Sequence, residues 1–372
     1  MRKSTLWITI LLVLTLLAAG TVNANEYADE DWDEIIRLAK EEGELVAYAP
    51  TSRLAIAAQA FEEKYGIKVT THQLSEVEMI ERTYREAVTG INQVDLVLIE
   101  DLPSMYELLI KPGHLINYVP PAAREAVPPE HQNPLVFVYQ PRVIGYNTEV
   151  YEEEPIESIW ELTLPKWRGK VLMRDLAITG EHQNFFAELV RRSHELEAEY
   201  ERFFGEPLVL TEENAGLEFM KRLIQNDLVI MTSDTRISEA VGARGQTDPP
   251  IGFIYVYSHH RHKEAKDLAL EAMENVKPFS GYSYGMFIQI AAKAPHPNAA
   301  KLFANFLNTP EGYEAWHNGV GFYSMNKNID PPEDGHRDSW DWWAERVWSY
   351  DVEFATQNRG YILDAWMRFM NY

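Results

Sequence analysis

Two spacings of apolar residues alternate along the first part of the chain. Apolar positions recur at helical spacing over residues 30–42, and Gly43 follows directly, which predicts a helix that ends there. Residues 44–49 are almost continuously apolar and predict a buried strand. The polar turn after this strand predicts another helix, capped by Thr51 or Ser52.

The same alternation continues through two more units. Residues 67–74 predict a second strand, 76–90 a second helix and 94–100 a third strand. The apolar run of the third strand is too continuous for a sheet with one face in water. Strands that alternate with helices in this way predict an α/β protein with a parallel sheet covered on both sides.

The pattern changes near Pro120 and then returns. Prolines punctuate the following segment, whose short apolar pieces at 135–139 and 143–146 suit a crossing between two lobes. The alternation then restarts with strands expected at 170–176, 227–233, 250–257 and 281–292 and helices at 184–204 and 213–225. A tryptophan-rich helical pair is expected at the end of the chain.

The segment after the last of these strands carries two sharp helix starts. Pro295 and Pro297 stop the strand because proline has no backbone N–H to donate. Asn298 is the predicted N-cap of the next helix, and Thr309 is the predicted N-cap of the helix after it. Pro310 then occupies the first helical position, where the missing N–H costs nothing. This segment is expected to be scaffold.

The N-terminus has the composition of a secretory signal peptide. Arg2 and Lys3 precede an apolar run from Leu6 to Ala19, and small residues suit cleavage after Ala24. An uncleaved membrane anchor is the alternative, but the run is shorter than the roughly 20 residues that usually span a bilayer. We therefore expect an exported protein that is released into the periplasm.

Composition narrows the class of protein. The 372 residues include no cysteine, so neither disulfides nor lipid attachment at an N-terminal cysteine can hold the protein, and 46% hydrophobic residues supply enough core for two domains. The formal net charge is −23, or −25 once the signal peptide takes away its two basic residues. Such a charge repels nucleic acid and anionic lipid, so no nucleic-acid partner is expected. A local pocket can still bind a small anion.

Four motifs in order resemble one protein family. They are "AFEEKYGIKVTTHQL", "VIGYNTEVY", "SIWELTLPKWRGKVLM" and "APHPNAAKLFANFLNTPEGYEAW". Over about residues 32–325 the chain resembles the extracellular solute-binding proteins of ATP-driven (ABC) importers, nearest to the ferric-iron type, whose relatives bind iron, sugar phosphates, phosphonates or thiamine. The resemblance implies a type II periplasmic-binding-protein fold, in which two lobes, each a mixed sheet flanked by helices, close on a ligand about a two-strand hinge.

The resemblance also implies how the chain is divided. The C-terminal helices are left without a lobe assignment. The expected parts are a signal peptide at 1–24, lobe 1 at 25–138 plus 279–325, lobe 2 at 142–276, hinge strands near 139–146 and 276–280, and C-terminal helices at 326–372.

Candidate ligand contacts stand in the loops that follow the strands, because ligands of α/β sheets bind at the carboxyl ends of strands. Hydroxyls beside free N–H groups at a helix start suit an anion, and Arg236 adds a bidentate clamp. Simple helix capping is the alternative for each loop. The candidates are Thr51, Ser52, Ser75, Glu100 and Asp101 in lobe 1, and Thr179, Glu181, Ser233, Asp234, Arg236 and Tyr282 in lobe 2 and the returning strand.

Metal binding has weaker support. Ferric-iron binders of this family commonly use a pair of adjacent tyrosines, and this chain has no tandem tyrosine. Tyr282 and Tyr284, two apart in a strand, share one side of the sheet and suit either the core or a cleft wall. The histidines at 259, 260 and 262 suit an exposed polar turn better than a metal site. We predict neither a metal site nor a cofactor.

The resulting hypothesis is a binding protein and not an enzyme. It captures a small phosphorylated or otherwise anionic solute, acts as a monomer in the periplasm and delivers the solute to an ABC permease in the inner membrane. The alternatives are a ferric-iron transport protein, a sensor module that docks on a membrane receptor, and an exported hydrolase that uses Glu100 and Asp101. The hydrolase is disfavoured because H-E-x-x-H does not occur and because the adjacent acids Glu100 and Asp101 point apart if the strand continues through them.

Overall fold

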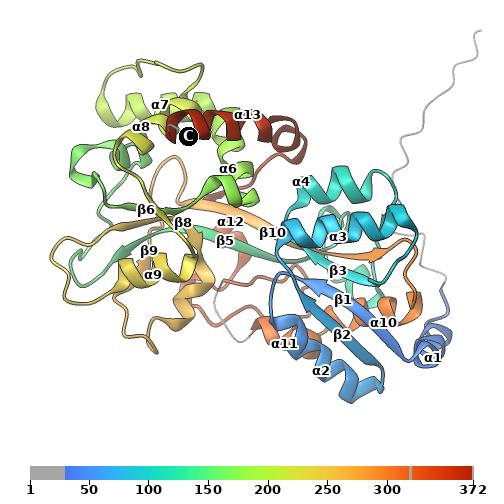
Figure 1. Cartoon of the computed structure of the whole chain (residues 1–372). Helices are drawn as coiled ribbons and strands as arrows, with labels where there is room; N and C mark the ends of the chain where they lie inside the picture. The colour runs from blue at the N-terminus through green and yellow to red at the C-terminus, as the bar shows by residue number, and fades with distance from the viewer. Residues whose placement is uncertain (1–29, 318–320, 371–372) are drawn as a thin grey trace, which may run out of the picture.

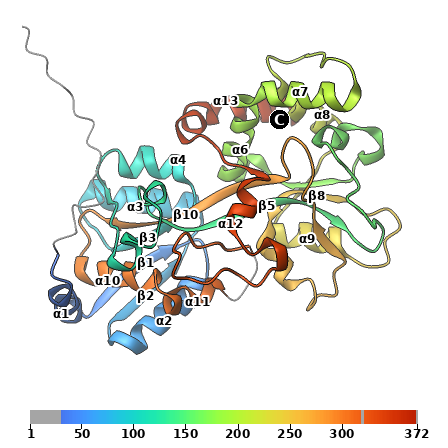
Figure 2. The same ribbon diagram turned by 180° about the vertical axis from the view of Figure 1, so that it is seen from behind.

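A computed structural model describes residues 30–317 and 321–370 of the chain, so the predicted signal peptide lies outside the described residues. The described chain forms two α/β lobes that lie side by side, with the N-terminal lobe on the right in Figure 1 and on the left in the view from behind in Figure 2. No helix in this part of the chain is both long and apolar enough to cross a bilayer.

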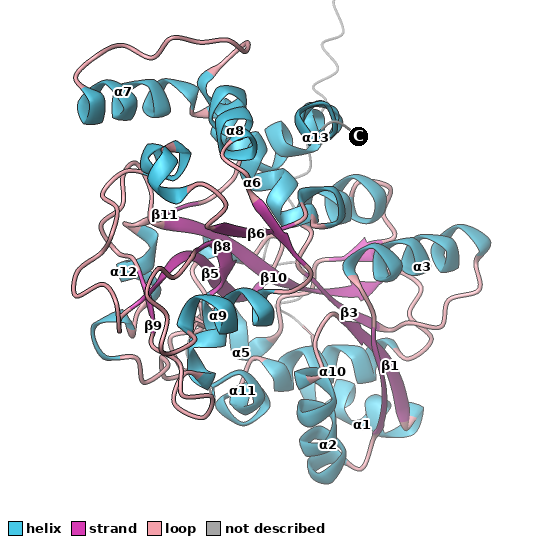
Figure 3. Ribbon diagram, turned by 60° about the vertical axis from the view of Figure 1, so that its left-hand side comes forward, coloured by secondary structure: helices cyan, strands magenta, loops and turns pink. Residues whose placement is uncertain are grey.

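The strands of the described residues join in one mixed sheet that passes through both lobes (Figure 3). Their order is β2-β1-β3-β10-β5-β8-β6-β7, with the short strands β4 and β11 on β10 and β9 on β5. The strands are β1 Glu44–Ala49, β2 Lys68–Gln73, β3 Leu96–Ile99, β4 Leu115–Ile116, β5 Val136–Asn147, β6 Val171–Arg174, β7 Val229–Met231, β8 Ile251–Val256, β9 Leu270–Ala272, β10 Gly281–Ala291 and β11 Val347–Trp348.

Helices cover both faces of the sheet in each lobe (Figure 1). They begin and end close to the positions that the apolar spacing predicts; Gly43, for example, ends the first helix with a left-handed φ of 72°. The helices are α1 Trp32–Glu42, α2 Arg53–Tyr65, α3 Glu76–Thr89, α4 Leu102–Met105, α5 Pro121–Arg124, α6 Gly180–Arg191, α7 Ser193–Phe204, α8 Ala215–Gln225, α9 Asp234–Gly242, α10 Pro297–Leu307, α11 Pro310–His317, α12 Trp340–Ala344 and α13 Val352–Met370.

Pairing is parallel among β1, β2 and β3 and among β6, β7 and β8, and it is antiparallel where β5 and β10 pair with each other and with β3, β4, β8 and β9. Strand β1 pairs in parallel with β2 and β3, and β6 pairs in parallel with β7 and β8. Strand β10 is antiparallel to β3 and β5, and β5 is antiparallel to β8. The sheet is therefore mixed, and the all-parallel arrangement expected from the alternation holds only for the groups β1–β2–β3 and β6–β7–β8.

The apolar residues gather on both sides of the long β5–β10 pair. In the N-terminal lobe, which we call lobe 1, Phe137 contacts Trp316 edge-to-face, with ring centroids 4.7 Å apart. In the other lobe, lobe 2, the fully buried Trp160 and Trp366 anchor a second aromatic cluster. Cores of this size explain how a chain without cysteine holds each lobe together.

The β5–β10 pair is the place where the chain crosses between the lobes. The two short apolar pieces expected at 135–139 and 143–146 are one continuous strand that runs through Pro141. Gly281 must stay small here, because a Cβ at this position would lie 2.0 Å from the carbonyl oxygen of Arg142. The close crossing brings Arg142 to the junction of the lobes.

The C-terminal segment belongs mainly to lobe 2. Strand β11 pairs with β10 at Gly281 and Tyr282, and α13 packs on α6 and α8. Helix α13 also reaches α4 of lobe 1, so it spans the line between the lobes. The expected tryptophan-rich helical pair corresponds to α12 and α13, with the short strand β11 between them.

Two details of the sequence prediction are wrong. The helix expected over 184–204 is two helices, because the chain turns at Arg192 between α6 and α7. Asn298 is not an N-cap, since α10 begins at Pro297 and its free N–H groups are satisfied by Glu42 at the end of α1. Thr309 does cap α11 by accepting a hydrogen bond from the Gly312 N–H at 3.2 Å.

Candidate ligand-binding site

A cleft of about 360 Å³ opens where the carboxyl ends of strands from both lobes meet. The loops after β1, β2 and β3 supply its lobe 1 wall, and the ends of β6, β7 and β8 supply its lobe 2 wall. Its lining is Pro50, Leu74, Ser75, Glu76, Val77, Glu100, Asp101, Arg142, Arg174, Ile178, Thr179, Gly180, Glu181, Asp234, Val256 and Tyr284.

The lobe 1 wall is acidic and internally braced. Ser75 caps α3 by accepting a hydrogen bond from the Glu78 N–H at 3.3 Å. Glu76, the first residue of α3, accepts hydrogen bonds from the backbone N–H groups of Glu100 and Asp101, each at 3.2 Å. These contacts fix the loop after β3, so that the carboxylate of Glu100 is held at the cleft.

The lobe 2 wall carries a buried ion-pair cluster. Arg142 on β5 donates to Asp234, the first residue of α9, at 3.2 Å, and Arg174 at the end of β6 lies 3.4 Å from the same carboxylate. Burial alone raises the pKa of Asp234, but the guanidinium groups of Arg142 and Arg174 outweigh it and hold the pKa below its ordinary value. Asp234 is therefore ionised and neutralises much of the positive charge of this wall.

The start of α6 also faces the cleft. Thr179 precedes the helix and Glu181 stands in its first turn, where a carboxylate is favoured by the helix dipole. The Thr179 side chain is 2% exposed, and its hydroxyl oxygen has no hydrogen-bond partner in the described chain. A buried hydroxyl without a partner beside a cleft indicates a contact with a bound molecule.

Two cleft carboxyl groups hold their protons unusually strongly. Burial, together with the nearby charge of Glu181, raises the pKa of Glu100 to about 8. Burial and the charges of Glu100 and Glu181 likewise raise the pKa of Glu76 well above its ordinary value. Acidic groups from both lobes therefore lie close enough to repel one another across the cleft.

The side chain of Arg359 on α13 connects the two lobes beside these acids. Arg359 lies 3.0 Å from the carboxylate of Asp101 and donates a hydrogen bond to the hydroxyl of Ser104. Gly180 of lobe 2 lies against the Arg359 guanidinium. A Cβ at position 180 would be only 2.6 Å from this group, so the close approach requires glycine. These contacts join the lobes directly, which describes a closed arrangement.

The structure brings some of the sequence candidates together and leaves others apart. The residues that line the cleft are Ser75, Glu100, Asp101, Thr179, Glu181 and Asp234. The residues that lie outside its lining are Thr51, Ser52, Ser233, Arg236 and Tyr282.

The outlying candidates have local roles. Thr51 accepts a hydrogen bond from the Arg53 N–H at 3.3 Å, and Ser52 is exposed without a capping bond. Ser233 caps α9 by accepting from the backbone N–H of Arg236, whose side chain is exposed. Local hydrogen bonding at a helix start therefore describes Thr51 and Ser233 better than an anion clamp does.

Tyr282 lies in the core of lobe 2, where it stacks on Phe185 with ring centroids 4.6 Å apart. Its neighbour Tyr284 lines the cleft instead, under the guanidinium of Arg142 at 5.0 Å. Sequence reasoning did not select Arg142 or Arg174, although each is a charge inside or at the end of an apolar strand. Such a charge in a buried strand is the signal that indicates them.

The three histidines near residue 260 do not form a metal site. His260 is buried, lies 2.7 Å from the Tyr255 hydroxyl and stacks with that ring. Burial lowers its pKa to about 3, so it is neutral. Within residues 30–317 and 321–370, no three His, Asp or Glu side chains are grouped in a way that holds a metal ion.

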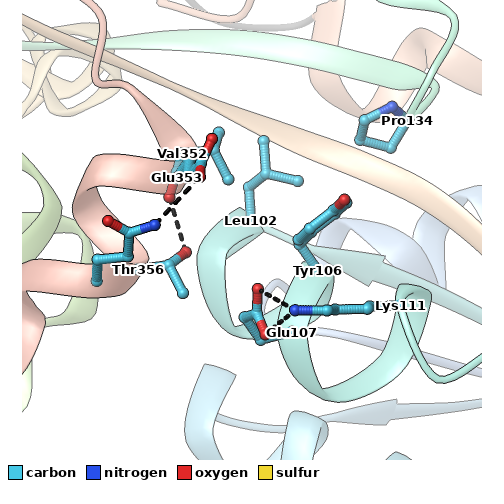
Figure 4. A pocket seen from close by; sticks show the side chains of 9 residues that line it. Leu102, Tyr106, Glu107, Lys111, Pro134, Val352, Glu353 and Thr356 are labelled. Carbon is cyan, nitrogen blue, oxygen red and sulfur yellow. Dashed lines mark hydrogen bonds and ion pairs between the residues drawn. The ribbon is translucent and has the colours of Figure 1, made fainter. Parts of the chain in front are cut away.

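A second groove lies outside the cleft, between α4 and α13 (Figure 4). Its volume is about 440 Å³, and it is lined by Leu102, Tyr106, Glu107, Lys111, Pro134, Val352, Glu353, Thr356 and Gln357. Its charged groups are already satisfied, since Lys111 pairs with Glu107 at 3.0 Å and Gln357 donates to Glu353 at 3.1 Å. With no unpartnered buried polar atom in its lining, it is a weaker candidate site than the cleft.

A cleft between two α/β lobes, lined by charged groups from both, is the architecture of solute-binding proteins. The family model for bacterial extracellular solute-binding proteins matches residues 57–340, so the chain belongs to this family. The family consists of binding proteins that act outside the cytoplasm. A search of curated proteins finds no match.

Solved structures confirm the fold. Iron-bound HitA from Pseudomonas aeruginosa superposes with a TM-score of 0.69 at 18% identity, over 87% of this chain and 99% of HitA. AfuA from Actinobacillus pleuropneumoniae, solved with exogenous fructose-6-phosphate bound, gives 0.67 at 19% identity, over 88% and 99%. The apo ferric ion-binding protein A from Pasteurella haemolytica gives 0.67 at 14% identity, over 88% and 98%. The predicted family and the type II binding-protein fold are both confirmed.

Proposed function

We propose that the protein is the periplasmic receptor of an ABC importer and captures a small polar organic solute by closing its two lobes. The observation that carries this proposal is the origin of the cleft lining. Glu100 comes from lobe 1, Glu181 from lobe 2 and Arg142 from the β5 crossing, so one ligand between them contacts both lobes at once. Such a ligand stabilises the closed form by its differential affinity for it.

The structure weakens the support for a purely anionic solute. The anion hypothesis depended on Arg236, whose side chain is exposed and outside the cleft lining. The arginines that do line the cleft, Arg142 and Arg174, are both paired with Asp234. A phosphorylated solute remains the second candidate because AfuA, a structural relative, was solved with a sugar phosphate.

Ferric iron is the third candidate and has less support from this chain. HitA, a structural relative, was solved with iron. The described residues of this protein offer no grouping of three metal-ligating side chains, and Tyr282 is buried in the core of lobe 2. Iron that arrives together with a carried anion is the form of this alternative that the cleft allows.

The proposed function is tested by looking for a retained solute and for closure. The protein is purified without denaturant from its periplasmic fraction and analysed by native mass spectrometry, then stripped by unfolding and refolding. We expect a mass difference equal to one small molecule, and a smaller radius of gyration by small-angle scattering when that molecule is added back. The same radius with and without a saturating retained solute contradicts lobe closure, and no retained or added-back solute contradicts the receptor function.

The partner is inferred from the family and needs a separate experiment. A receptor delivers its solute to a permease, so the liganded protein is expected to stimulate ATP hydrolysis by the reconstituted importer more than the stripped protein does. Stimulation of a membrane sensor kinase and not of an importer favours the sensor alternative. For a monomer, size-exclusion chromatography is expected to give the mass of a single chain, 42.9 kDa or slightly less after cleavage of the signal peptide.

A further inference from the structure

We propose that the captured solute carries a positively charged amine or guanidine group, held across the cleft between Glu100 of lobe 1 and Glu181 of lobe 2. This inference rests on the proposed function, because it names the chemical class of solute for the same cleft. It departs from the anionic solute that the sequence alone favoured. The cleft geometry, the pairing of its charges and one unpartnered hydroxyl support it.

The two carboxylates that face the solute have no cationic partner in the described chain. The side chain of Glu181 is buried, with 7% exposed, and it has neither a hydrogen bond nor a basic group within ion-pair distance. Glu100 receives one side-chain hydrogen bond, from the amide of Gln140 at 3.2 Å, and forms no ion pair. A buried carboxylate without a charged partner is costly, so a cation supplied by the ligand is strongly favoured here.

The cleft arginines are already matched to other carboxylates. Asp234 pairs with both Arg142 and Arg174, and Asp101 pairs with Arg359. These contacts leave Glu100 and Glu181 as acids without an ion-pair partner at the centre of the cleft. Glu100, whose pKa is about 8, ionises fully at neutral pH only when a cation stabilises its charge. An anionic ligand group would face these two acids and compete with Asp234 for its arginines.

An independent observation comes from Thr179. Its hydroxyl oxygen is buried beside the cleft and has no partner in the described chain. An ammonium group has three N–H donors and no acceptor, and Glu100, Glu181 and Thr179 supply three acceptors. The donor set of a primary amine therefore matches the unsatisfied acceptors of the cleft.

The pKa of Glu100 agrees with this assignment. Burial and the charge of Glu181 raise this pKa. A cation placed between the two carboxyl groups would lower it again, because a positive charge stabilises the ionised form of Glu100. The other groups that face Glu100 are Gln140, Arg142 and Asp234, and none of them pairs with it ionically. Long-range attraction points the same way, because the net charge of −23 concentrates cations near the protein.

The inference concerns an organic cation and not a metal ion. A metal site needs several ligands converging on one point, and the described residues provide no group of three such side chains. An organic ammonium or guanidinium needs only separate acceptors around it. The Nε of Arg142, a buried donor without a partner, suits an oxygen atom elsewhere on the same solute.

The test uses probes in matched pairs in which a neutral group of similar size replaces each cationic group. The stripped protein is titrated calorimetrically with glucosamine against glucose, glucosamine phosphate against glucose phosphate, putrescine against butanediol, and arginine against citrulline. In at least one pair the cationic member is expected to bind at least about tenfold more tightly, the effect of one charge-assisted hydrogen bond. Glu100→Gln and Glu181→Gln are each expected to remove that preference.

Controls separate a loss of charge from a loss of fold. Glu107→Gln changes a carboxylate in the outer groove between α4 and α13 and should keep the full preference. Thr179→Val removes only the third acceptor and should weaken the cationic member more than its neutral counterpart. Melting curves of the unliganded variants confirm that each is folded, and glutamine keeps the shape of glutamate.

The outcomes distinguish this inference from the proposed function. If neutral or anionic members bind as tightly as cationic ones, or if the glutamine variants keep the preference, the cation assignment is overturned while the receptor function stands. If no cationic member binds better than its counterpart, the assignment is also overturned. If native mass spectrometry finds no solute and the lobes never close, the proposed function itself fails.

Discussion

Asp234 holds two arginines at the point where β5, β6 and α9 meet. Both guanidinium groups lie within 3.4 Å of its carboxylate, and the Arg142 side chain is almost fully buried. A buried pair of this kind contributes little net stability when complete, but its interruption leaves an uncompensated buried charge. The cluster therefore fixes the geometry of the cleft at the residue scale.

Asp234→Ala is expected to lower the free energy of unfolding by about 3 kcal/mol, because Arg142 and Arg174 are left unpaired. Urea unfolding at neutral pH measures the change. The control is Asp248→Ala, which removes an exposed carboxylate 2.7 Å from Lys170. An exposed ion pair contributes less than about 1 kcal/mol to the free energy of unfolding. Equal losses of this free energy in Asp234→Ala and Asp248→Ala would contradict the stabilising role assigned to the Asp234 cluster.

Glu100 makes lobe closure depend on pH. Its pKa is about 8 in the described arrangement, and we expect it to fall toward the ordinary value of 4.5 when the lobes separate, because separation exposes the carboxyl group to water and moves Glu181 away. The contribution of Glu100 to the stability of the closed form is therefore fully present below about pH 4.5, and it is lost as the pH rises through about 8. Small-angle scattering of the stripped protein between about pH 5 and pH 9 should show opening at high pH.

The same titration with Glu100→Gln serves as the control. Because glutamine does not ionise, the radius of gyration should vary much less with pH. Glu76, whose pKa is also raised, accounts for any opening that remains. An unchanged pH dependence in Glu100→Gln contradicts the role assigned to this residue.

At the scale of elements, carboxylates at helix ends accept hydrogen bonds from the backbone of neighbouring elements. The first N–H groups of α10 donate to Glu42 at the end of α1, with the Ala299 N–H at 2.7 Å. Similarly, Glu76 at the start of α3 binds the loop after β3. Side chains that satisfy a neighbouring element in this way tie the secondary structure of lobe 1 together.

Helix α13 of lobe 2 is joined to lobe 1 by the side chain of Arg359. It packs on α6 and α8 of lobe 2, while Arg359 bonds Asp101 and Ser104 of lobe 1. Arg359→Ala is expected to shift the stripped protein toward an open form, with a larger radius of gyration. The apparent affinity for the retained solute should fall in proportion to the lost closed population, measured by calorimetry.

The matched control is Arg368→Ala on the same helix. Arg368 pairs with Glu212 at 3.0 Å, and both residues belong to lobe 2, so its loss should leave the radius of gyration unchanged. Equal radii for Arg359→Ala and the unmodified protein would show that the bridge to Asp101 does not hold the lobes together.

At the scale of the whole molecule, two lobes share one sheet that crosses between them twice (Figure 1). We propose that the antiparallel β5–β10 pair is the hinge, since small rotations about it would move whole lobes. The strong negative charge surrounds this assembly and favours the encounter with a cationic solute. The long-range field that favours this encounter is therefore a property of the whole molecule and not of the cleft alone.

The mature protein is expected to begin near Asn25, because the apolar run and the small residues before it have the pattern of a cleavable signal peptide. Intact mass and N-terminal sequencing of protein from the periplasmic fraction measure this. The mature form should carry a net charge of −25, which follows from the loss of Arg2 and Lys3. Recovery from the membrane fraction with Met1 in place contradicts the prediction.

Much of the local structure follows from the sequence alone. The helix that ends at Gly43, the strand 44–49 and the cap at Thr309 are where local apolar spacing and turn chemistry put them. Six cleft residues were also found from the sequence, because ligand loops follow strands in α/β sheets. These features depend on neighbours within a few positions in the chain.

The remainder depends on contacts between distant residues. Arg142 and Asp234 are 92 positions apart, and Arg359 meets Ser104 in α4 of the opposite lobe, 255 positions away. Whether Arg236 or Arg174 enters the cleft depends on how α9 and β6 are oriented by the sheet, and Asn298 loses its cap to Glu42 from another helix. Spacing along the chain carries no information about such pairings. The charge balance of the cleft, and with it the class of solute, is therefore decided by the tertiary structure, because Coulomb energy depends on distance in space and on burial.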